Sequence, residues 1–456
     1  MSVRLRFAAA GVMAAVVLVG GLRVRGDVEA GPTTEPHPAA ADVTGAWVCP
    51  HGGGDGWHAW VTVANPTDRE ALIRLTGLGP EGPADRQEAA LAPGTAATIE
   101  VPAGQMAAAT RVEFFGAPVA AGMVVARPDG GGTGAEPCAA RPARRLRLAD
   151  GTTVRGERTF VVLANPTAVD AVVDLTLVTE ERVVRPGPLR GLLLPPGRTE
   201  AVDLGRSVLG ERTVSVQVEA RLGRVSASLI GLRDARGLRL SLASTAASRD
   251  RYLPGGADDG TAKVVVLAGR SEAPFRVRVQ GLTAQEETLE EAAVAAGRTA
   301  TFEVEASDAS LVVAAEGAAT LTAARRSGRA DVGDQASTAG ATETAEGWVI
   351  PPVLGSGGGD QFLVLQNPGQ EAVTATLTLL GRDGPLPGPG GGTVTVDGGR
   401  ARVVPLADGA PPVAAVVRSE GGSLVAAQVG VIPGGYTVAV GSRLGSFGPV
   451  DAGVSS

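Results

Sequence analysis

The sequence of 456 residues is poor in several residue types: it holds three histidines, two cysteines, one lysine and three asparagines, and aromatic residues make up 3% of it. With so few histidines and no G-x-S-x-G pattern, it offers no visible Ser-His-Asp hydrolase constellation. The formal net charge of −7 argues against a nucleic-acid surface, because phosphate binding needs a concentrated positive face. The scarcity of aromatic residues implies hydrophobic cores built mainly from Val, Leu and Ala.

All three asparagines lie in one repeated element, an apolar run followed by Asn-Pro. Proline lacks the N–H that a strand ladder requires, and the asparagine side chain can bond backbone groups just beyond it. We therefore assign these residues to structural turns that end a strand, and not to a binding site. The residues are Asn65 and Pro66, Asn165 and Pro166, and Asn367 and Pro368.

A fourth copy of the element, residues 265–271, replaces Asn-Pro with Gly269-Arg270. The copies recur about every hundred residues, which is the length of a whole small domain. Between them, apolar and polar residues alternate with a period of two, as in antiparallel sheets, and about seven short strands fit each unit. The sequence thus predicts an all-β protein: four tandem immunoglobulin-like antiparallel β-sandwich domains after an N-terminal transmembrane helix.

Each predicted domain opens on a strand and closes on a hairpin. The opening strands begin at Trp47, Tyr252 and Trp348, with a weaker equivalent at Leu146. In the first unit the closing hairpin turns near Gly116. The predicted boundaries are 46–140, 141–250, 251–326 and 347–445 for the four sandwiches.

The third unit is the most divergent. Residues 286–293 are rich in glutamate and alanine and fit one or two helical turns where the other units have a strand. After it, residues 327–346 are polar and lack periodicity, which predicts a flexible linker. A loose tail is expected at 446–456.

The N-terminus carries a targeting signal. Residues 7–22 form an uncharged apolar run of 16 residues flanked by arginines. We interpret residues 1–26 as a signal anchor or transmembrane helix, with a cleaved signal peptide as the competing interpretation. Residues 27–45, rich in Pro, Thr and Ala, are expected to be a spacer. The predicted location is the cell membrane, single-pass with an extracytoplasmic C-terminal region, or secreted after cleavage.

No catalytic, cofactor-binding or metal-ligating set emerges. His51, Asp55 and His58 lie near Cys49, but their spacing matches no standard ligand pattern. The glycine-rich segment 77–82 matches the G-x-G-x-x-G pattern of a dinucleotide site, but Pro80 within it and Pro83 just after it forbid the helix that such a site requires.

Two other features have competing interpretations. Trp57 and Trp60 are three apart on a strand, so one is expected to fill the core while the other could contact a ligand such as a sugar ring. Basic residues cluster at 141–147, where a solvated linker is favoured over an anionic-polymer patch.

With the anchor, the Trp-x-Cys-Pro opening at residues 47–50 and the repeated Asn-Pro element in view, the chain resembles a family of uncharacterised exported actinobacterial proteins, a domain of unknown function. The resemblance implies location and fold, and it implies no catalytic residue. We expect a non-enzymatic, membrane-tethered extracytoplasmic array with a structural, spacer or binding role in the cell envelope, its partner an envelope protein or cell-wall glycan. The alternatives are a carbohydrate-binding or adhesive surface protein and an unrecognised envelope enzyme.

The two cysteines, Cys49 and Cys138, generate a testable prediction. They flank the first unit, and an oxidising compartment favours a disulfide that closes a loop of about 90 residues, worth roughly 4 kcal/mol in the chain-entropy model. Non-reducing peptide mapping of protein taken from the envelope should recover the two cysteine peptides joined, and reduction should lower the melting temperature of the first unit. Free thiols in that material would contradict the pairing.

Overall fold

Buried and more exposed side chains alternate along the strands of this all-β protein. In the computed structural model, β3 (Ala71–Gly79) buries Ala71, Ile73 and Leu75, while Leu72 and Arg74 lie on the other face. This is the period of two that the sequence predicts. The structure describes residues 43–445, except 235–236, 256–260, 270–272, 285–286, 306–309, 330 and 332.

The strands follow the four sequence repeats, called repeats 1 to 4 from here on. Repeat 1 contains β1 (Val43–Cys49), β2 (His58–Ala64), β3, β4 (Gly82–Leu91), β5 (Ala96–Val101), β6 (Ala109–Phe115), β7 (Ala120–Ala126), the 3-10 helix η1 (Pro128–Gly130) and β8 (Thr133–Pro137). Repeat 2 contains β9 (Arg145–Gly151), β10 (Glu157–Ala164), β11 (Ala171–Val178), β12 (Val183–Val184), η2 (Gly187–Leu189), β13 (Leu192–Leu194), β14 (Thr199–Asp203), η3 (Leu204–Arg206), β15 (Val214–Leu222), β16 (Ser226–Arg233) and β17 (Leu238–Leu242).

The second half of the chain repeats this plan. Repeat 3 contains β18 (Asp250–Leu253), β19 (Thr261–Ala268), β20 (Phe275–Leu282), β21 (Glu287–Val294), β22 (Thr299–Glu305), β23 (Ser310–Ala315), β24 (Leu321–Arg329) and β25 (Asp334–Thr338). Repeat 4 contains β26 (Gly347–Ile350), β27 (Gly359–Asn367), β28 (Val373–Leu380), β29 (Pro385–Pro387), η4 (Pro389–Gly391), β30 (Thr393–Val396), β31 (Arg400–Ala410), β32 (Ala414–Glu420), β33 (Val425–Ile432), β34 (Gly435–Val440) and β35 (Ser442–Arg443).

Each repeat folds into two antiparallel sheets. In repeat 1 the strand orders are β1-β6-β3-β4 and β5-β2-β7-β8, and equivalent strands of the other repeats pair in the same way. The core of the repeat lies between its two sheets, where Ile73 and Phe114 from one sheet pack in one cluster with Val61 and Met123 from the other.

This strand order differs from that of an immunoglobulin domain, in which the first two strands are neighbours in one sheet, because β1 and β2 lie in different sheets. Here β6 and β7 belong to different sheets. The turn near Gly116, which the sequence predicts as a hairpin, instead carries the chain across the end of the sandwich, and Ala117 and Val119 are fully buried there. The closing hairpin of the repeat is β7–β8.

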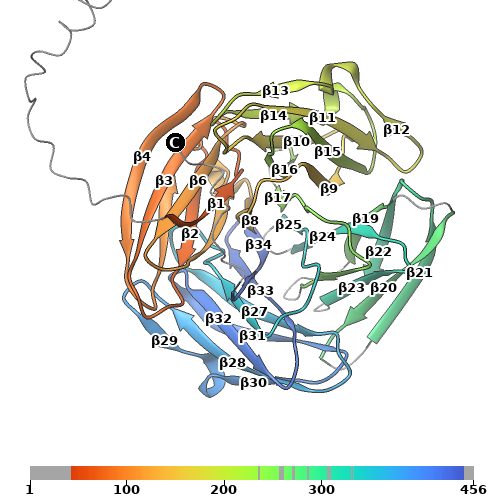
Figure 1. Ribbon diagram of the computed structural model, residues 1–456. Helices are drawn as coiled ribbons and strands as arrows, with labels where there is room; N and C mark the ends of the chain where they lie inside the picture. The colour runs from red at the N-terminus through yellow and green to blue at the C-terminus, as the bar shows by residue number, and fades with distance from the viewer. Residues whose placement is uncertain are drawn as a thin grey trace, which may run out of the picture. The chain divides into compact units, whose positions relative to one another are not determined.

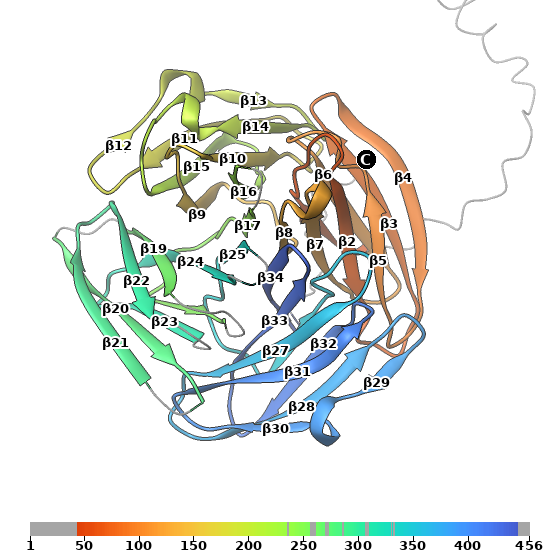
Figure 2. The same cartoon turned by 180° about the vertical axis from the view of Figure 1, so that it is seen from behind.

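The four repeats follow one another around a ring (Figure 1). Equivalent backbone contacts connect each repeat to the next. In each case the end of the third strand of one repeat meets the start of the fifth strand, or of its equivalent, in the following repeat. Because the fourth repeat makes this contact with the first, the ring is closed (Figure 2). The contacts are a parallel bridge between Gly79 and Arg198, and hydrogen bonds from the amides of Thr299, Ala401 and Ala96 to the carbonyls of Thr179, Thr283 and Gly381 respectively.

The closing strands of the repeats, β8, β17, β25 and β34, meet in the middle of the ring. Each contacts the closing strand of the next repeat, and β34 contacts β8. Each is an outer strand of its own sheet, so its free edge would otherwise expose N–H and C=O groups. We call these four strands the central bundle.

One side chain binds the starts of the central bundle together. The carboxylate of Asp334, the first residue of β25, accepts hydrogen bonds from the backbone amides of Thr133, Leu238 and Tyr436, at 2.9, 3.1 and 3.1 Å. These donors belong to the three other repeats. Burial raises the pKa of Asp334, although the amides that bond to it act in the opposite direction.

Glycines make room for this carboxylate. By the pairing of each closing strand with its hairpin partner, Gly132, Gly237 and Gly435 stand where repeat 3 has Asp334. A Cβ on Gly132 would lie 2.5 Å from the amide nitrogen of Leu238 and 3.0 Å from a carboxylate oxygen of Asp334. The middle of the ring therefore accommodates one such side chain, and repeat 3 supplies it.

Two predictions for repeat 3 are wrong. Residues 327–346 do not form a linker, because they contain the end of β24 and the whole of β25, which is buried in the central bundle. Their polar composition is explained by hydrogen bonds that they make to the other repeats. The expected helical turns at 286–293 are also absent from 287 onward, since β21 occupies Glu287–Val294 and pairs with β20, and Glu290 and Glu291 are exposed.

The predicted transmembrane segment, the spacer up to residue 42 and the tail at 446–456 lie outside the described residues. Within the residues that are described, no helix is long and apolar enough to cross a membrane.

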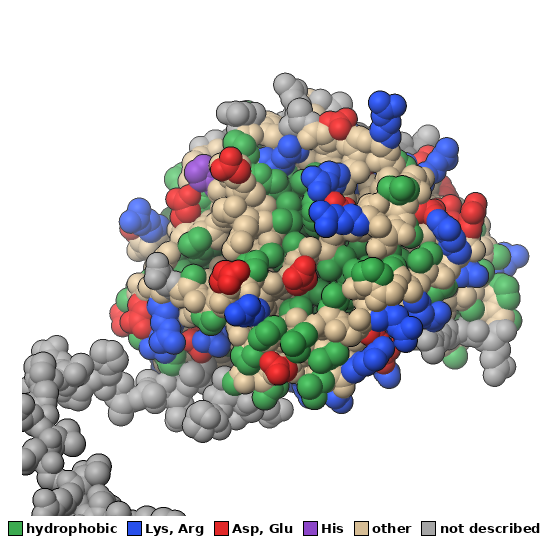
Figure 3. Space-filling view, turned by 90° about the horizontal axis from the view of Figure 1, so that it is seen from above, with side chains coloured by type: hydrophobic (Ala, Val, Ile, Leu, Met, Phe, Trp, Pro, Cys, Tyr) green, Lys and Arg blue, Asp and Glu red, His purple; other side chains and the backbone are tan. Residues whose placement is uncertain are grey.

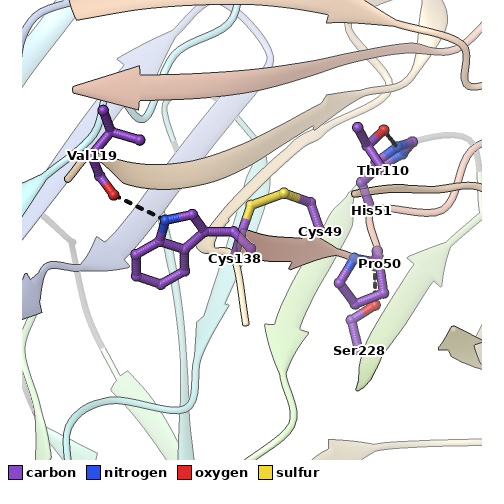
Figure 4. Close-up of a disulfide and its surroundings, with 8 residues drawn as sticks. Cys49, Pro50, His51, Thr110, Val119, Cys138 and Ser228 are labelled. Carbon is purple, nitrogen blue, oxygen red and sulfur yellow. Dashed lines mark hydrogen bonds between the residues drawn. A yellow bond between two sulfur atoms is a disulfide. The ribbon is translucent and has the colours of Figure 1, made fainter. Parts of the chain in front are cut away.

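Cys49 and Cys138 form a disulfide between the end of β1 and the residue after β8 (Figure 4). Both residues are buried. Beside the disulfide, the indole N–H of Trp47 donates to the carbonyl of Val119 at 2.9 Å. The bond thus joins the opening and closing strands of repeat 1 at the point where the chain leaves the central bundle.

Substitution of Asp334 tests the central bundle. Asp334→Ala would leave three buried amides without an acceptor, and since each unsatisfied buried group costs about 1 to 3 kcal/mol, we expect a loss of at least about 3 kcal/mol in the free energy of unfolding. Asp331→Ala is the matched control, because that carboxylate is half exposed and bonds Arg329 locally. Urea denaturation measures both, and a wild-type midpoint for Asp334→Ala would contradict the role of this carboxylate.

Candidate functional site

A pocket of about 370 Å³ lies at the other end of the central bundle, where the closing strands finish. All four repeats line it, since its walls come from the segments just after β8, β17 and β25 and the end of β34. Trp47 and Trp348, from the opening strands of repeats 1 and 4, add apolar surface. We call it the axial pocket. Its size falls within the range typical of small-molecule sites.

Glu136, on β8, lies at the inner side of the axial pocket and is almost completely buried. Burial raises the pKa of its carboxyl group well above the ordinary value of 4.5, against the opposing effect of hydrogen bonds from the backbone of Ala339 and Leu242 and from the side chain of Thr338. The Ala339 amide donates to it at 3.2 Å. Glu136 therefore connects closing strands of repeats 1, 2 and 3, as Asp334 does at the opposite end.

Arg251, on β18, is the other buried ionisable residue of the pocket, with 2% of its surface exposed. Its Nη2 donates to the Oγ of Ser244 at 2.8 Å and to the carbonyl of Ala246 at 3.1 Å, while its Nε has no hydrogen-bond partner. Burial and the nearby charge of Arg147 lower the pKa of Arg251 to about 10. Its guanidinium is still cationic at neutral pH.

The pairing of the opening strands shows what Arg251 replaces. Trp47 pairs with Val112, Leu146 with Val218, Arg251 with Val313 and Trp348 with Val417, all at equivalent places in their sheets. The alignment of the repeats made from the sequence alone instead equates Tyr252 with Trp47, which is wrong by one residue. The amide of Tyr252 bonds the carbonyl of Ala341 just as the amide of Val48 bonds that of Ala139. Arg251 thus occupies a position that is apolar in the other three repeats.

The mouth of the axial pocket carries mixed charges. Arg443 and Glu343 form an ion pair at 2.7 Å, with both side chains about half exposed. Arg141 also lines the pocket, so the lining has three arginines and two glutamates, one of which, Glu136, has a raised pKa. Elsewhere on the surface, acidic and basic side chains are interspersed, as on the face in Figure 3.

The asparagines of the repeated element are buried and hydrogen-bonded to nearby backbone. The Nδ2 of Asn165 donates to the carbonyls of Val169 and Leu194, at 2.7 and 2.8 Å, and its Oδ1 accepts from the backbone and side chain of Thr167. Asn65 and Asn367 bond to equivalent backbone groups. Pro66, Pro166 and Pro368 follow them at the strand ends.

Repeat 3 has Ala268, and not Gly269, at the asparagine position. The amide of Ala268 bonds the carbonyl of Arg298, as that of Asn165 bonds Arg198. Val264 and Val266 consequently face the core, whereas the sequence comparison assigns Val265 to that face. Because of this offset of one residue, every side chain of the strand points to the face opposite to the one that the sequence predicts.

The structure brings together few of the candidate ligand residues. Trp60 is 9% exposed and packs against repeat 4, which removes it as a ligand contact, while Trp57 is partly buried with the Arg127 guanidinium 6.0 Å from its ring. His51 is fully buried and bonds Thr110 and the carbonyl of Gly52, and burial lowers its pKa to about 4 (Figure 4). His58 is exposed and bonds Glu100. No cluster suited to a metal occurs among the residues that the structure describes.

The basic cluster at 141–147 does not form one patch. Arg141 lines the axial pocket, whereas Arg145 and Arg147 line a separate surface cleft of repeats 2 and 3. Arg145 lies 3.6 Å from Glu219, and Arg144 donates to the carbonyl of Arg221. The arginines therefore face different surroundings on either side of the opening strand.

Sequence reasoning missed Asp334, Glu136 and Arg251. Each is a charged residue at a position where the other repeats have small, hydroxylated or apolar residues. An alignment of the repeats in the correct register would have singled them out. The offset in repeat 3 concealed two of the three.

A family model matches residues 94–351 and residues 346–442, which together span most of the sequence. The chain belongs to DUF5719, a family of unknown function. The resemblance to a domain of unknown function is thereby confirmed. The second matched segment of this DUF5719 chain coincides with repeat 4. No curated protein matches the chain.

The raised pKa of Glu136 predicts a pH dependence of stability. Between about pH 4.5 and the folded-state pKa, the folded protein binds one more proton than the unfolded chain, so this group lowers stability as pH rises, by up to about 1.4 kcal/mol per pH unit. Glu136→Gln removes the titration and should become more stable relative to wild type as pH rises. Urea denaturation at pH 5 to 8 measures the difference, with the exposed Glu343→Gln as control. Parallel wild-type and Glu136→Gln curves would contradict it.

Proposed function

We propose that this protein is a non-enzymatic, membrane-tethered binding protein on the extracytoplasmic side of the cell membrane. The observation that carries the binding role is the axial pocket, to which all four repeats contribute. We further infer that the chain consists of four β-sandwich domains closed into a ring and preceded by a transmembrane helix at residues 1–26.

Two observations support the location. The Cys49–Cys138 disulfide is of the kind that persists in oxidising compartments outside the cytoplasm. The apolar run at residues 7–22, flanked by arginines, has the composition of an anchor or an export signal.

The closed ring favours a binding role over a spacer role. An open row of domains could act as a long spacer, but here the first and fourth repeats are in contact, so the repeats add little length. In the closed ring, residues at the ends of the four closing strands instead line one shared pocket. Binding in the envelope is therefore favoured over spacing, with an envelope component as the partner.

The pocket chemistry favours binding over catalysis. Glu136 is committed to hydrogen bonds with closing strands, and Glu343 is paired with Arg443. No histidine lines the pocket, and its serines and threonines have no adjacent base among the lining residues. For the carbohydrate-binding alternative, burial of Trp60 leaves Trp57 alone, which is too little for a stacking platform.

Topology and attachment can be tested on intact cells. On intact cells that carry the Leu209→Cys variant, a membrane-impermeant maleimide should label the new thiol, because Leu209 is 80% exposed, whereas the buried, disulfide-bonded Cys49 and Cys138 should not react. The chain should remain with the membranes after a high-salt wash, and deletion of residues 1–26 should abolish both export and attachment. Labelling only after the cells are lysed would contradict an extracytoplasmic location.

A further inference from the structure

The axial pocket contains a positive charge that the fold does not require. Of the four equivalent opening-strand positions, three hold Trp47, Leu146 and Trp348, and the fourth holds Arg251. Burying a guanidinium is costly unless it is paired and hydrogen-bonded. A tryptophan at this position fits the same fold twice, with its indole bonded to a backbone carbonyl each time.

Inside the protein Arg251 meets only neutral acceptors. Its two bonds go to a hydroxyl and a backbone carbonyl, and no carboxylate oxygen of the described residues lies within 4.0 Å of its nitrogens. The nearest charge that affects it, Arg147, has the same sign. Its Nε–H group is buried and has no hydrogen-bond acceptor within the protein.

Two other largely buried arginines of the chain, Arg326 and Arg239, are paired with carboxylates. Arg326 bonds both carboxylate oxygens of the fully buried Asp150, at 3.0 and 3.3 Å from its Nε. Arg239 bonds Glu157 at 2.9 Å. These arginines have acidic partners within the protein, as buried charges usually do, and Arg251 does not.

The surroundings of Arg251 suit an anion with an apolar body. Arg141 and Arg443 lie in the same lining, and Trp47 and Trp348 supply flat apolar surface. Burial raises the pKa of Glu136, the buried carboxyl group of the lining, and so favours its neutral form, which does not repel a negative ligand. A guanidinium recognises carboxylate and phosphate groups through paired N–H donors.

We propose that the axial pocket binds a small organic anion whose carboxylate or phosphate group bonds to the guanidinium of Arg251. This inference rests on the proposed binding function and specifies its ligand class. The pocket volume of about 370 Å³ sets the scale of the ligand. The anionic group takes the place of the acidic side chain that Arg251 lacks.

Thermal unfolding of the purified, oxidised full chain tests the proposal with defined probes. At constant ionic strength and pH 7, sodium benzoate, sodium phosphate and phenyl phosphate are each titrated, with benzamide as the uncharged counterpart. We expect a saturable rise in melting temperature with at least one of the anions and none with benzamide. Absence of a saturable rise with all three anions overturns the proposal, whatever any variant does.

Arg251→Trp provides the decisive variant, because it installs the residue that repeats 1 and 4 use at the same position. We expect it to fold, to melt at or above the wild-type temperature without probe, and to lose at least tenfold in anion affinity. Arg251→Gln is a second variant with the same expected loss, in case the indole does not fit. Arg158→Gln, which removes an exposed arginine paired with Asp203, should bind as wild type does. Anion binding retained in Arg251→Gln overturns the assignment of the site.

These measurements are independent of cellular location. Anion binding by a chain that cell labelling places in the cytoplasm would contradict the envelope function and leave the anion site standing. An exported, anchored chain without an anion-dependent rise would contradict the anion site alone.

Discussion

The hydrogen bonds from three backbone amides to the Asp334 carboxylate are the interaction on which the closed ring depends. Each closing strand reaches the middle of the ring with an unused edge, and a buried edge needs partners for its polar groups. Four identical strands meeting around an axis cannot all place a side chain in the same space. Glycines in three repeats leave room for the aspartate of the fourth, whose carboxylate then serves the amides of the other three.

At the other end of the central bundle, the axial pocket receives a contribution from every repeat. Asp334 and Glu136 hold the two ends of the central bundle, and both carry a raised pKa because burial outweighs the hydrogen bonds that favour ionisation. Arg251 stands near the second end with neutral partners only. Repeat 3, which departs most from the common sequence, supplies both Asp334 and Arg251.

Several sequence predictions failed because strand pairing and contacts between repeats are not visible in the local pattern of the sequence. Residues 327–346 are polar because their partners lie in other repeats, and polarity without periodicity is also what a linker shows. Glu290 and Glu291 lie on an exposed edge strand, where their helix propensity is overridden by the pairing of β21 with β20. The one-residue offset in repeat 3 could not be seen without the strand pairing, because the sequence there has no asparagine to mark the position.

The sequence by itself determined the strands, the repeat and the turns, because alternation of apolar residues and the Asn-Pro signal are local properties of the chain. It also pointed to the cysteine pair, since two cysteines at the ends of one repeat leave few other uses in an oxidising compartment. Only the tertiary structure decided that the repeats close into a ring and that β6 and β7 lie in different sheets. It also decided that Asp334 and Glu136 bond to residues about a hundred or more positions away, and that Glu136 and Arg251 line a common pocket. Those features depend on which edges and faces come together in space, and the local pattern of the chain carries no record of that.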